Sequence, residues 1–256
     1  MKVAAFDFDG TTLFEHGMAA ETVDAIRSWQ DAGHLAVAAT GKSRFAARSA
    51  LDGSDLTFDY SVLFIGAAVS DRSGAILHST VLDGDEVRRL VTELAAVDGI
   101  AVYGTRLDGR DVRFSSTVAA GATTSVLVDF DDIAPEQCAG QQFVGVPIWV
   151  PGDPDRKQRI PSWIEENFTV GCVVNQNFLD VVPVGTTKAG GLRWLGTHLG
   201  IPREQVQIYT FGDSWNDLSM HAIADRSFSF PWSPPEVQSA TDAVIDSVAA
   251  ALPQLA

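Results

Sequence analysis

Two carboxylates separated by a single residue stand near the start of the chain, in the segment Asp7-Phe8-Asp9-Gly10-Thr11-Thr12. They come at the end of an apolar run from Lys2 to Phe8, which is typical of a strand buried in a parallel sheet. The carboxyl ends of such strands form the edge at which open α/β sheets bind ligands. Because Gly10 allows the chain to turn at once, the Asp7 carboxylate and the Asp9 backbone carbonyl can face one cavity. Both groups are hard oxygen ligands of the kind that suits Mg²⁺.

Another carboxylate, Asp213, lies in the segment Gly212-Asp213-Ser214-Trp215-Asn216-Asp217, directly after an expected strand from Val206 to Phe211. Taken alone, this segment is more commonly an N-cap followed by surface acids, and a lone Asp-x-Asp-Gly is commonly a turn. Their shared place at strand ends favours a common site instead, because clustered carboxylates need a cation to offset their repulsion. We therefore predict a Mg²⁺ site with Asp7, Asp9 and Asp213 as ligands, where Asn216 or Asp217 could hold metal-bound water.

Groups that could bind an anion follow two other strand patterns. Thr40 and Gly41 come after an apolar strand from Leu35 to Ala39, so the hydroxyl and nearby N–H groups could hold a phosphate oxygen at a helix start. Lys188 adds the fixed positive charge that an anionic transition state requires. A solvated lysine in a first helical turn is its ordinary interpretation, but the preceding strand-like segment from Phe178 to Val184 favours a role in the site.

Alternating strand and helix patterns at both ends of the chain predict a doubly wound, mostly parallel sheet, which is an α/β fold. We expect helices at Ala19 to Ala32, Ser43 to Leu51, Ala189 to Leu199 and Trp215 to Ile223. We expect strands at Lys2 to Phe8, Leu35 to Ala39, Ser61 to Ile65, Val206 to Phe211, Ser227 to Phe230 and Ala243 to Ile245. A hairpin is expected from Ala67 to Ser70 and Ala75 to Leu77.

The middle of the chain lacks this strict alternation, which indicates a smaller α+β domain inserted into the first. Its expected helices are Asp85 to Ala96 and Asp155 to Asn167. Its expected strands are Ile100 to Gly104, Val112 to Ser115, Val126 to Asp129 and Val144 to Val150, followed by a hairpin from Thr169 to Val182. The run Asp129-Phe130-Asp131-Asp132 superficially repeats the first acidic segment without its Gly-Thr continuation, so we interpret it as an exposed turn. The expected division is a core of residues 1–81 and 184–256 and an inserted domain of residues 82–183.

The composition excludes several classes of function. The 256 residues include 18 Lys and Arg and 33 Asp and Glu, which gives a formal net charge of −15. Nucleic acids and anionic membranes need clustered positive charge, so neither is an expected partner. The two cysteines, Cys138 and Cys172, are too few for a disulfide framework or a zinc site. No apolar stretch approaches the length of a membrane-spanning helix and no signal-peptide pattern begins the chain, so we expect a cytoplasmic protein.

The segments around Asp7, Thr40, Lys188 and Asp213 resemble, in this order, the four motifs of the haloacid dehalogenase superfamily. The insertion between the second and third segments is similar to that of the Cof-type phosphatases, which carry an α/β cap. The segment Ile65-Gly66-Ala67-Ala68-Val69 and Val182-Pro183 before Lys188 fit that subfamily too. The resemblance covers essentially the whole chain, although the cap matches only in its position and coarse pattern.

The resemblance implies a role for each matched residue. Asp7 would be the nucleophile that takes the phosphoryl group, and Asp9 would protonate the leaving oxygen and then activate water. Thr40, Gly41, Lys188 and Asn216 would bind the phosphoryl oxygens or the substrate. The implied ligands of Mg²⁺ are Asp7, the Asp9 carbonyl and Asp213, with Gly10 and Asp217 in supporting places.

Two departures from the family pattern concern substrate contacts. Family members often carry Asn where this chain has Ile65, and many carry Arg where this chain has Lys42. A lysine is a point charge and cannot make the bidentate contacts of an arginine.

Three functional interpretations remain open. The first is a Mg²⁺-dependent phosphatase that acts on small phosphorylated metabolites, with sugar phosphates as the favoured group, in a monomer or homodimer. The second is a phosphomutase or phosphotransferase that uses the same Asp7 intermediate. The third is a non-catalytic phosphate- or protein-binding module. The presence of both Asp7 and Asp9 argues against a pure binding module, which has no need for two acids.

Overall fold

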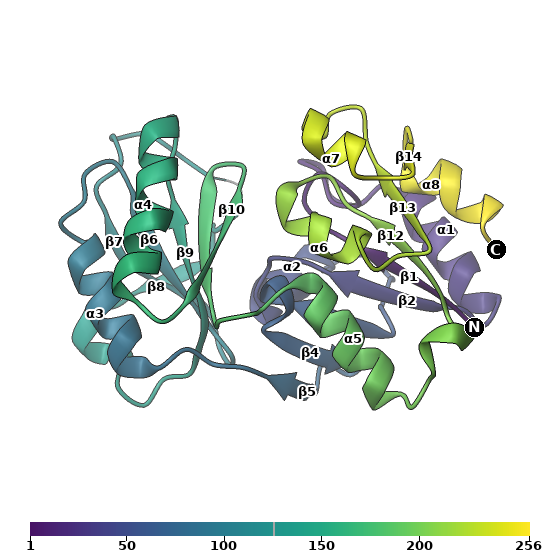
Figure 1. The fold of residues 1–256 in the computed structure, drawn as a ribbon, viewed down its shortest axis with the longest axis horizontal. Coiled ribbons are helices and arrows are strands. Elements are labelled where there is room, and N and C mark those ends of the chain that lie inside the picture. The colour runs from purple at the N-terminus through teal and green to yellow at the C-terminus, as the bar shows by residue number, and fades with distance from the viewer. Residues whose placement is uncertain (125) are drawn as a thin grey trace. The chain divides into compact units, whose positions relative to one another are not determined.

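The computed structural model describes residues 1–124 and 126–256, which form two compact units (Figure 1). The core unit consists of Met1–Lys42, Ala47–His78 and Thr187–Ala256. The cap unit consists of Ser79–Thr186 together with the short segment Ser43–Ala46. No sequence signal indicated that Ser43–Ala46 would belong with the inserted part of the chain. The expected boundaries at residues 81/82 and 183/184 stay a prediction.

An eight-stranded sheet with the order β14-β13-β12-β1-β2-β3-β4-β5 organises the core unit. Its strands are β1 (Lys2–Phe6), β2 (Leu35–Ala39), β3 (Tyr60–Leu63), β4 (Ala68–Asp71), β5 (Ile76–Ser79), β12 (Gln207–Phe211), β13 (Arg226–Ser229) and β14 (Ala243–Val244). The six strands from β14 to β3 in this order run parallel, and β4 is antiparallel to β3. The predicted doubly wound, mostly parallel sheet is confirmed.

The carboxyl-terminal halves of the central strands carry small or aromatic side chains that are buried. Ala4, Ala5 and Phe6 of β1 have no solvent exposure. Phe211 of β12 stacks between Phe6 and Phe228, with ring centroids 5.0 and 4.9 Å away. Strand β1 ends at Phe6, two residues before the predicted end, so Asp7 is the first residue beyond the strand.

Helices of the core unit connect these strands (Figure 1). They are α1 (Ala20–Asp31), α2 (Arg44–Ala50), α5 (Lys188–His198), α6 (Leu218–His221), α7 (Pro235–Ser239) and α8 (Val248–Ala251), with short 3-10 turns η1 (Phe64–Gly66), η3 (Arg203–Gln205), η4 (Trp215–Asp217) and η5 (Leu252–Gln254). The first three residues of α2 belong to the cap unit. The single helix expected from Trp215 to Ile223 is wrong, because η4 precedes the one-turn α6. The Asp217 carboxylate accepts the Ser214 N–H at 3.0 Å, which closes a tight turn before α6 begins.

The cap unit contains a six-stranded sheet with the order β10-β11-β9-β6-β7-β8. Its elements are α3 (Gly84–Leu94), β6 (Ala101–Arg106), β7 (Asp111–Ser116), β8 (Phe130–Asp132), η2 (Pro135–Cys138), β9 (Phe143–Trp149), α4 (Pro154–Asn167), β10 (Gly171–Asn175) and β11 (Phe178–Val182). Apolar side chains of α3 and α4, such as Leu90 and Ile164, share one buried cluster with Val102 and Ile148 of the sheet. The expected hairpin from Thr169 to Val182 is confirmed as β10 and β11.

One strand of the cap was predicted in the wrong place. Residues 126–129 are not a strand, whereas Phe130–Asp132, expected to lie in an exposed turn, form β8 parallel to β7. The acids of this run are attracted to arginines of the neighbouring β6 and β7 region, in the pairs Asp129–Arg110, Asp131–Arg106, Asp131–Arg110 and Asp132–Arg113. These ion pairs join residues that are distant in the sequence, so hydrophobic periodicity does not reveal this strand.

Across the described residues, the helices are too short or too polar to cross a lipid bilayer.

Candidate active site

The site begins where β1 and β12 end side by side. Phe6 pairs with Phe211 in the parallel register, and the Asp7 N–H donates to the Phe211 carbonyl at 2.9 Å. The Thr12 hydroxyl donates to the Asp7 carbonyl at 2.7 Å, so both backbone groups of Asp7 are held. The Asp7 side chain is left at the carboxyl edge of the sheet, as predicted from the sequence.

Lys188, the first residue of α5, is buried between two of the acids. Its Nζ lies 2.7 Å from Asp7 Oδ1 and 2.5 Å from Asp217 Oδ1, and the side chain has no solvent exposure. The chain can bury this ammonium group because it is paired with carboxylates on two sides. Lys188 is therefore not the solvated lysine of the ordinary interpretation.

Asp7, Asp213 and Asp217 form a buried group in which one oxygen from each carboxylate lies within 4.8 Å of the others. Asp213 follows β12 as predicted. Asp217, expected only in a supporting place, is brought in by the tight turn η4. The sequence placed Asp217 beside the metal site, and the fold adds that its carboxylate is one of the three clustered acids.

The donor set fits a hard divalent cation. Carboxylate oxygens converge there, and the buried Asn216 Oδ1 has no hydrogen-bond partner within residues 1–124 and 126–256. A buried amide oxygen without a partner is costly, and a cation or its bound water would satisfy it. The Asp9 carboxylate is not one of the three clustered acids, and the Asp9 carbonyl stays a predicted ligand.

The electrostatics of the cluster also favour a cation. Burial, and then repulsion from Asp217, raise the pKa of Asp7 well above its ordinary value, although Lys188 opposes this. The same two causes raise the pKa of Asp213 to about 7. Burial alone would lower the pKa of Lys188, but the charges of Asp217 and Asp7 outweigh it and raise the pKa. One ammonium group does not neutralise three acids, so a divalent ion would stabilise their ionised forms.

Gly10 gives the acids room to meet. Its φ of +77° lies in the left-handed region, and a Cβ added there would stand 2.5 Å from Asp213 Oδ2. The requirement for glycine after Asp9 is therefore both conformational and steric.

The Asp9 carboxylate points to a different partner. Its Oδ2 lies 2.9 Å from Lys42 Nζ, and the Asp9 side chain is 47% exposed whereas that of Lys42 is 7% exposed. Asp9, the acid expected to exchange protons, thus remains accessible to solvent. One of its carboxylate oxygens is paired with the Lys42 ammonium.

The loop that carries Thr40 is held by hydrogen bonds from two backbone N–H groups. The Lys42 N–H donates to Thr40 Oγ1 at 3.1 Å, and the Ile65 N–H donates to the Thr40 carbonyl at 3.1 Å. A Cβ added at Gly41 would lie 3.7 Å from Asn216 Nδ2, so this loop adjoins the segment after β12. The predicted group of Thr40, Gly41 and Asn216 is brought together.

Sequence reasoning missed one support of the first segment. The Trp232 indole donates to the Gly10 carbonyl at 2.8 Å, and its ring stacks on Phe230 with centroids 4.9 Å apart. Trp232 lies 222 residues after Gly10, and no local pattern around it signals this contact.

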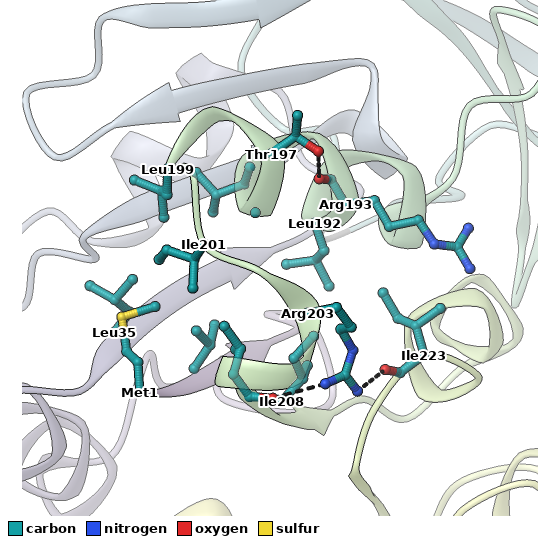
Figure 2. A pocket seen from close by; sticks show the side chains of 14 residues that line it. Met1, Leu35, Leu192, Arg193, Thr197, Leu199, Ile201, Arg203, Ile208 and Ile223 are labelled. Atoms are coloured by element: carbon teal, nitrogen blue, oxygen red, sulfur yellow. Dashed lines mark hydrogen bonds between the residues drawn. The ribbon is translucent and has the colours of Figure 1, made fainter.

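The core unit also has an apolar cavity of about 610 Å³ that shares no lining residue with this site. Figure 2 shows Leu35 and Ile208, near the amino ends of β2 and β12, beside Leu192 and Leu199 of α5 and its C-cap. The candidate active site lies beyond the opposite, carboxyl ends of the strands, where the charged side chains converge.

The comparisons with known proteins agree with this geometry. A family model described as haloacid dehalogenase-like hydrolase matches residues 4–251. The chain therefore belongs to the haloacid dehalogenase-like hydrolase family. The predicted resemblance to its Cof-type phosphatases, and with it the expected enzyme class, is confirmed.

Two relatives match over nearly the whole chain. An HMP-PP phosphatase of Klebsiella pneumoniae is 26% identical over 251 residues, covering 93% of this chain and 87% of the relative. A protein of Streptococcus pyogenes, provisionally named as a bifunctional phosphatase/peptidyl-prolyl cis-trans isomerase, is 24% identical over 255 residues. That match covers 97% of this chain and 51% of the relative, so the chain spans about half the length of that protein.

Solved structures confirm the predicted fold class. A haloacid dehalogenase-like hydrolase from B. subtilis has a TM-score of 0.85 at 20% identity, with 100% of each chain covered. The subclass IIB sugar phosphatase BT4131 has a TM-score of 0.81 at 18% identity, covering 100% of this chain and 99% of that one.

Proposed function

We propose that this protein is a Mg²⁺-dependent phosphatase that hydrolyses small phosphorylated metabolites through an aspartyl-phosphate intermediate on Asp7. The observation that carries the proposal is the buried Lys188, whose ammonium lies 2.7 Å from Asp7 at the ligand-binding edge of the sheet. A buried cation beside an acid gives an anionic phosphoryl group a fixed counter-charge next to a nucleophile.

In the proposed reaction Asp7 is the nucleophile and Asp9 is the general acid and base. An Asp7 carboxylate oxygen attacks phosphorus, the ester P–O bond breaks, and the Asp9 carboxyl gives its proton to the departing alcohol oxygen. Asp9 then takes a proton from water as the water oxygen attacks phosphorus and the bond from phosphorus to Asp7 breaks. Inorganic phosphate leaves, and both acids return to their starting states.

The charges around Asp7 must favour its ionised form, because only the carboxylate attacks. Asp7, Asp213 and the Asp9 carbonyl would hold the Mg²⁺ that the family implies, with Asn216 and Asp217 nearby. When bound, this ion supplies positive charge to the clustered acids and to the phosphoryl oxygens. Thr40 and Gly41 contribute a hydroxyl and an N–H group at the adjoining loop, where phosphoryl oxygens can be bound.

The proposed substrate class is supported by the cations beside the acids and by the similar proteins. BT4131 is a sugar phosphatase, and the Klebsiella relative is named an HMP-PP phosphatase. We favour sugar phosphates for this chain. Transfer to a second hydroxyl, as in a phosphomutase, would use the same Asp7 chemistry and differs only in its product.

A screen of phosphorylated metabolites tests the proposal. We expect release of inorganic phosphate that requires Mg²⁺, is stopped by a chelator and is abolished in Asp7→Asn, since an amide is a poor nucleophile. The exposed Asp24 of α1 gives a matched control, and Asp24→Asn should retain full activity. A new phosphate ester without free phosphate would indicate a phosphotransferase, and turnover by Asp7→Asn at the normal rate would refute the covalent mechanism.

A further inference from the structure

Lys42 is a buried cation that has no role in the proposed reaction steps. Only 7% of its side chain is exposed, and its ammonium lies 2.9 Å from Asp9 Oδ2. Burying an ammonium group is unfavourable unless a partner compensates for the lost water. Its partner is the acid that the proposed mechanism uses for both proton transfers.

The backbone around Lys42 is held by a strained turn. Phe64 and Ile65 have φ values of 42° and 57°, a region that bulky and β-branched residues rarely adopt. In this conformation the Phe64 N–H donates to the Lys42 carbonyl at 3.0 Å, and the Ile65 N–H donates to the Thr40 carbonyl at 3.1 Å. Strain of this kind persists only where the surrounding structure fixes it, and it gathers at functional sites.

Close packing fixes the same turn from its other side. Gly66 has a φ of +105°, and a Cβ added there would lie 2.1 Å from the Thr187 carbonyl oxygen. The turn is thus confined between the Thr40–Lys42 loop and the residue before Lys188. These contacts hold the Lys42 backbone in place, and its side chain extends from there to Asp9.

We propose that Lys42 is a positioning residue that holds Oδ2 of Asp9, so that Oδ1 is the oxygen that exchanges protons with the leaving group and with water. The kinetic consequence rests on the proposed phosphatase function. The Asp9 side chain is 47% exposed, so without a fixed partner it would sample several rotamers. An ammonium that engages one oxygen leaves the other in a defined direction, and proton transfer depends on such geometry.

Leaving-group dependence is the kinetic test. We expect Lys42→Met to lower kcat for an alkyl phosphate such as a hexose phosphate by roughly 10²-fold, the scale of a misplaced catalytic group. The loss should be much smaller for p-nitrophenyl phosphate, whose leaving group needs little help from an acid. Lys42→Arg should recover most of the alkyl phosphate activity because it retains the positive charge. A rise in KM that is equal for all esters, with kcat unchanged, would show that Lys42 only binds substrate and would overturn the proposal.

Two comparisons separate positioning from general damage. Lys2 of β1 is part-buried outside the site, where its Nζ donates to the Leu255 carbonyl at 2.7 Å, so Lys2→Met should leave both esters unaffected. In an Asp9→Asn background, Lys42→Met should cause little further loss, because residues that act through one another are not additive. Independent, multiplicative losses in the double variant would contradict the proposal.

Lysine labelling tests the contact without requiring turnover. With an acylating reagent and peptide mass spectrometry, modification of Lys42 should rise several-fold in Asp9→Asn, whereas that of Lys2 should stay constant. Equal labelling of Lys42 in both proteins would overturn the proposed contact. Absence of phosphate release from every ester by the wild-type protein would instead refute the phosphatase function, and the labelling would still decide whether Lys42 holds Asp9.

Discussion

Lys188 is fully buried and paired with two of the acids in the site. It joins Asp7 and Asp217, which lie far apart in the sequence, and it has no contact with solvent. A buried charge that loses its partner is strongly unfavourable, so the ammonium and the acids support one another in the folded chain.

Replacing Lys188 by methionine should therefore affect both activity and stability. We expect Lys188→Met to reduce the rate of phosphate release by roughly 10²–10³-fold, as for a lost donor to a developing oxyanion. Removal of one member of a buried ion pair should also lower the free energy of unfolding by about 3–5 kcal/mol. Steady-state kinetics and denaturant unfolding measure the two effects. A loss confined to substrate affinity would show that Lys188 only binds.

The raised pKa of Asp213 makes metal binding dependent on pH. Burial and then Asp217 raise this pKa to about 7, whereas an unfolded aspartate has a value of roughly 4. Between these values the folded carboxyl keeps its proton and the unfolded one does not, so metal-free stability falls as pH rises across the interval. A divalent cation opposes this loss because it stabilises the ionised acids. The increase in melting temperature caused by Mg²⁺ should thus be larger at pH 8 than at pH 5.5, and an equal increase would contradict the expected role of Asp213.

At the scale of elements, the ends of β1 and β12 determine where the acids meet. Gly10 is a point of close approach between the two segments, since an added Cβ would overlap the Asp213 carboxylate. The chain offers a close comparison in Gly17, which has a φ of +90° and no atom within 4 Å of an added Cβ.

Gly10→Ala and Gly17→Ala should differ in their effect on the metal site. Both substitutions place alanine at positive φ, which costs about 1–3 kcal/mol of stability. Only Gly10→Ala displaces the Asp213 carboxylate, so only that variant should lose the melting-temperature increase caused by Mg²⁺. Differential scanning fluorimetry with and without Mg²⁺ measures this increase. Equal responses to Mg²⁺ in the two variants would show that Gly10 does not control the Asp213 position.

The elements that the sequence predicted well are those with regular burial. Asp7 and Asp213 could be placed at strand ends because the apolar runs before them are uninterrupted, and Lys188 because it follows a strand-like segment. The inward turn of Asp217 depends on a 3-10 turn closed by its own side chain, which has no periodicity to detect. Contacts between distant segments, such as Lys42 with Asp9 and Trp232 with Gly10, depend on the tertiary fold and leave no local pattern.

At the scale of the whole molecule, the charge works against an anionic substrate. The chain has a formal net charge of −15, yet the proposed site must attract a phosphorylated metabolite. The paired Lys188 and Lys42 and the expected Mg²⁺ act only at short range, because their fields are offset by neighbouring acids.

Ionic strength should consequently raise catalytic efficiency. Long-range repulsion is screened as the Debye length shrinks from about 30 Å at 0.01 M salt to about 8 Å at 0.15 M. We expect kcat/KM for a dianionic sugar phosphate to increase over this range at saturating Mg²⁺, with kcat little changed. A steep decrease would indicate that a positive surface attracts the substrate and would contradict this account of the charge.

Trapping the covalent state tests the central assignment most directly. The protein is mixed with Mg²⁺ and an intact phosphate ester that it hydrolyses. The reaction is quenched in acid within one turnover, and the protein is digested for mass spectrometry. We predict the mass of one phosphoryl group on the peptide that contains Asp7, dependent on Mg²⁺ and absent from Asp7→Asn. Rapid turnover without this adduct, together with normal phosphate release by Asp7→Asn, would contradict the assignment of Asp7 as the nucleophile.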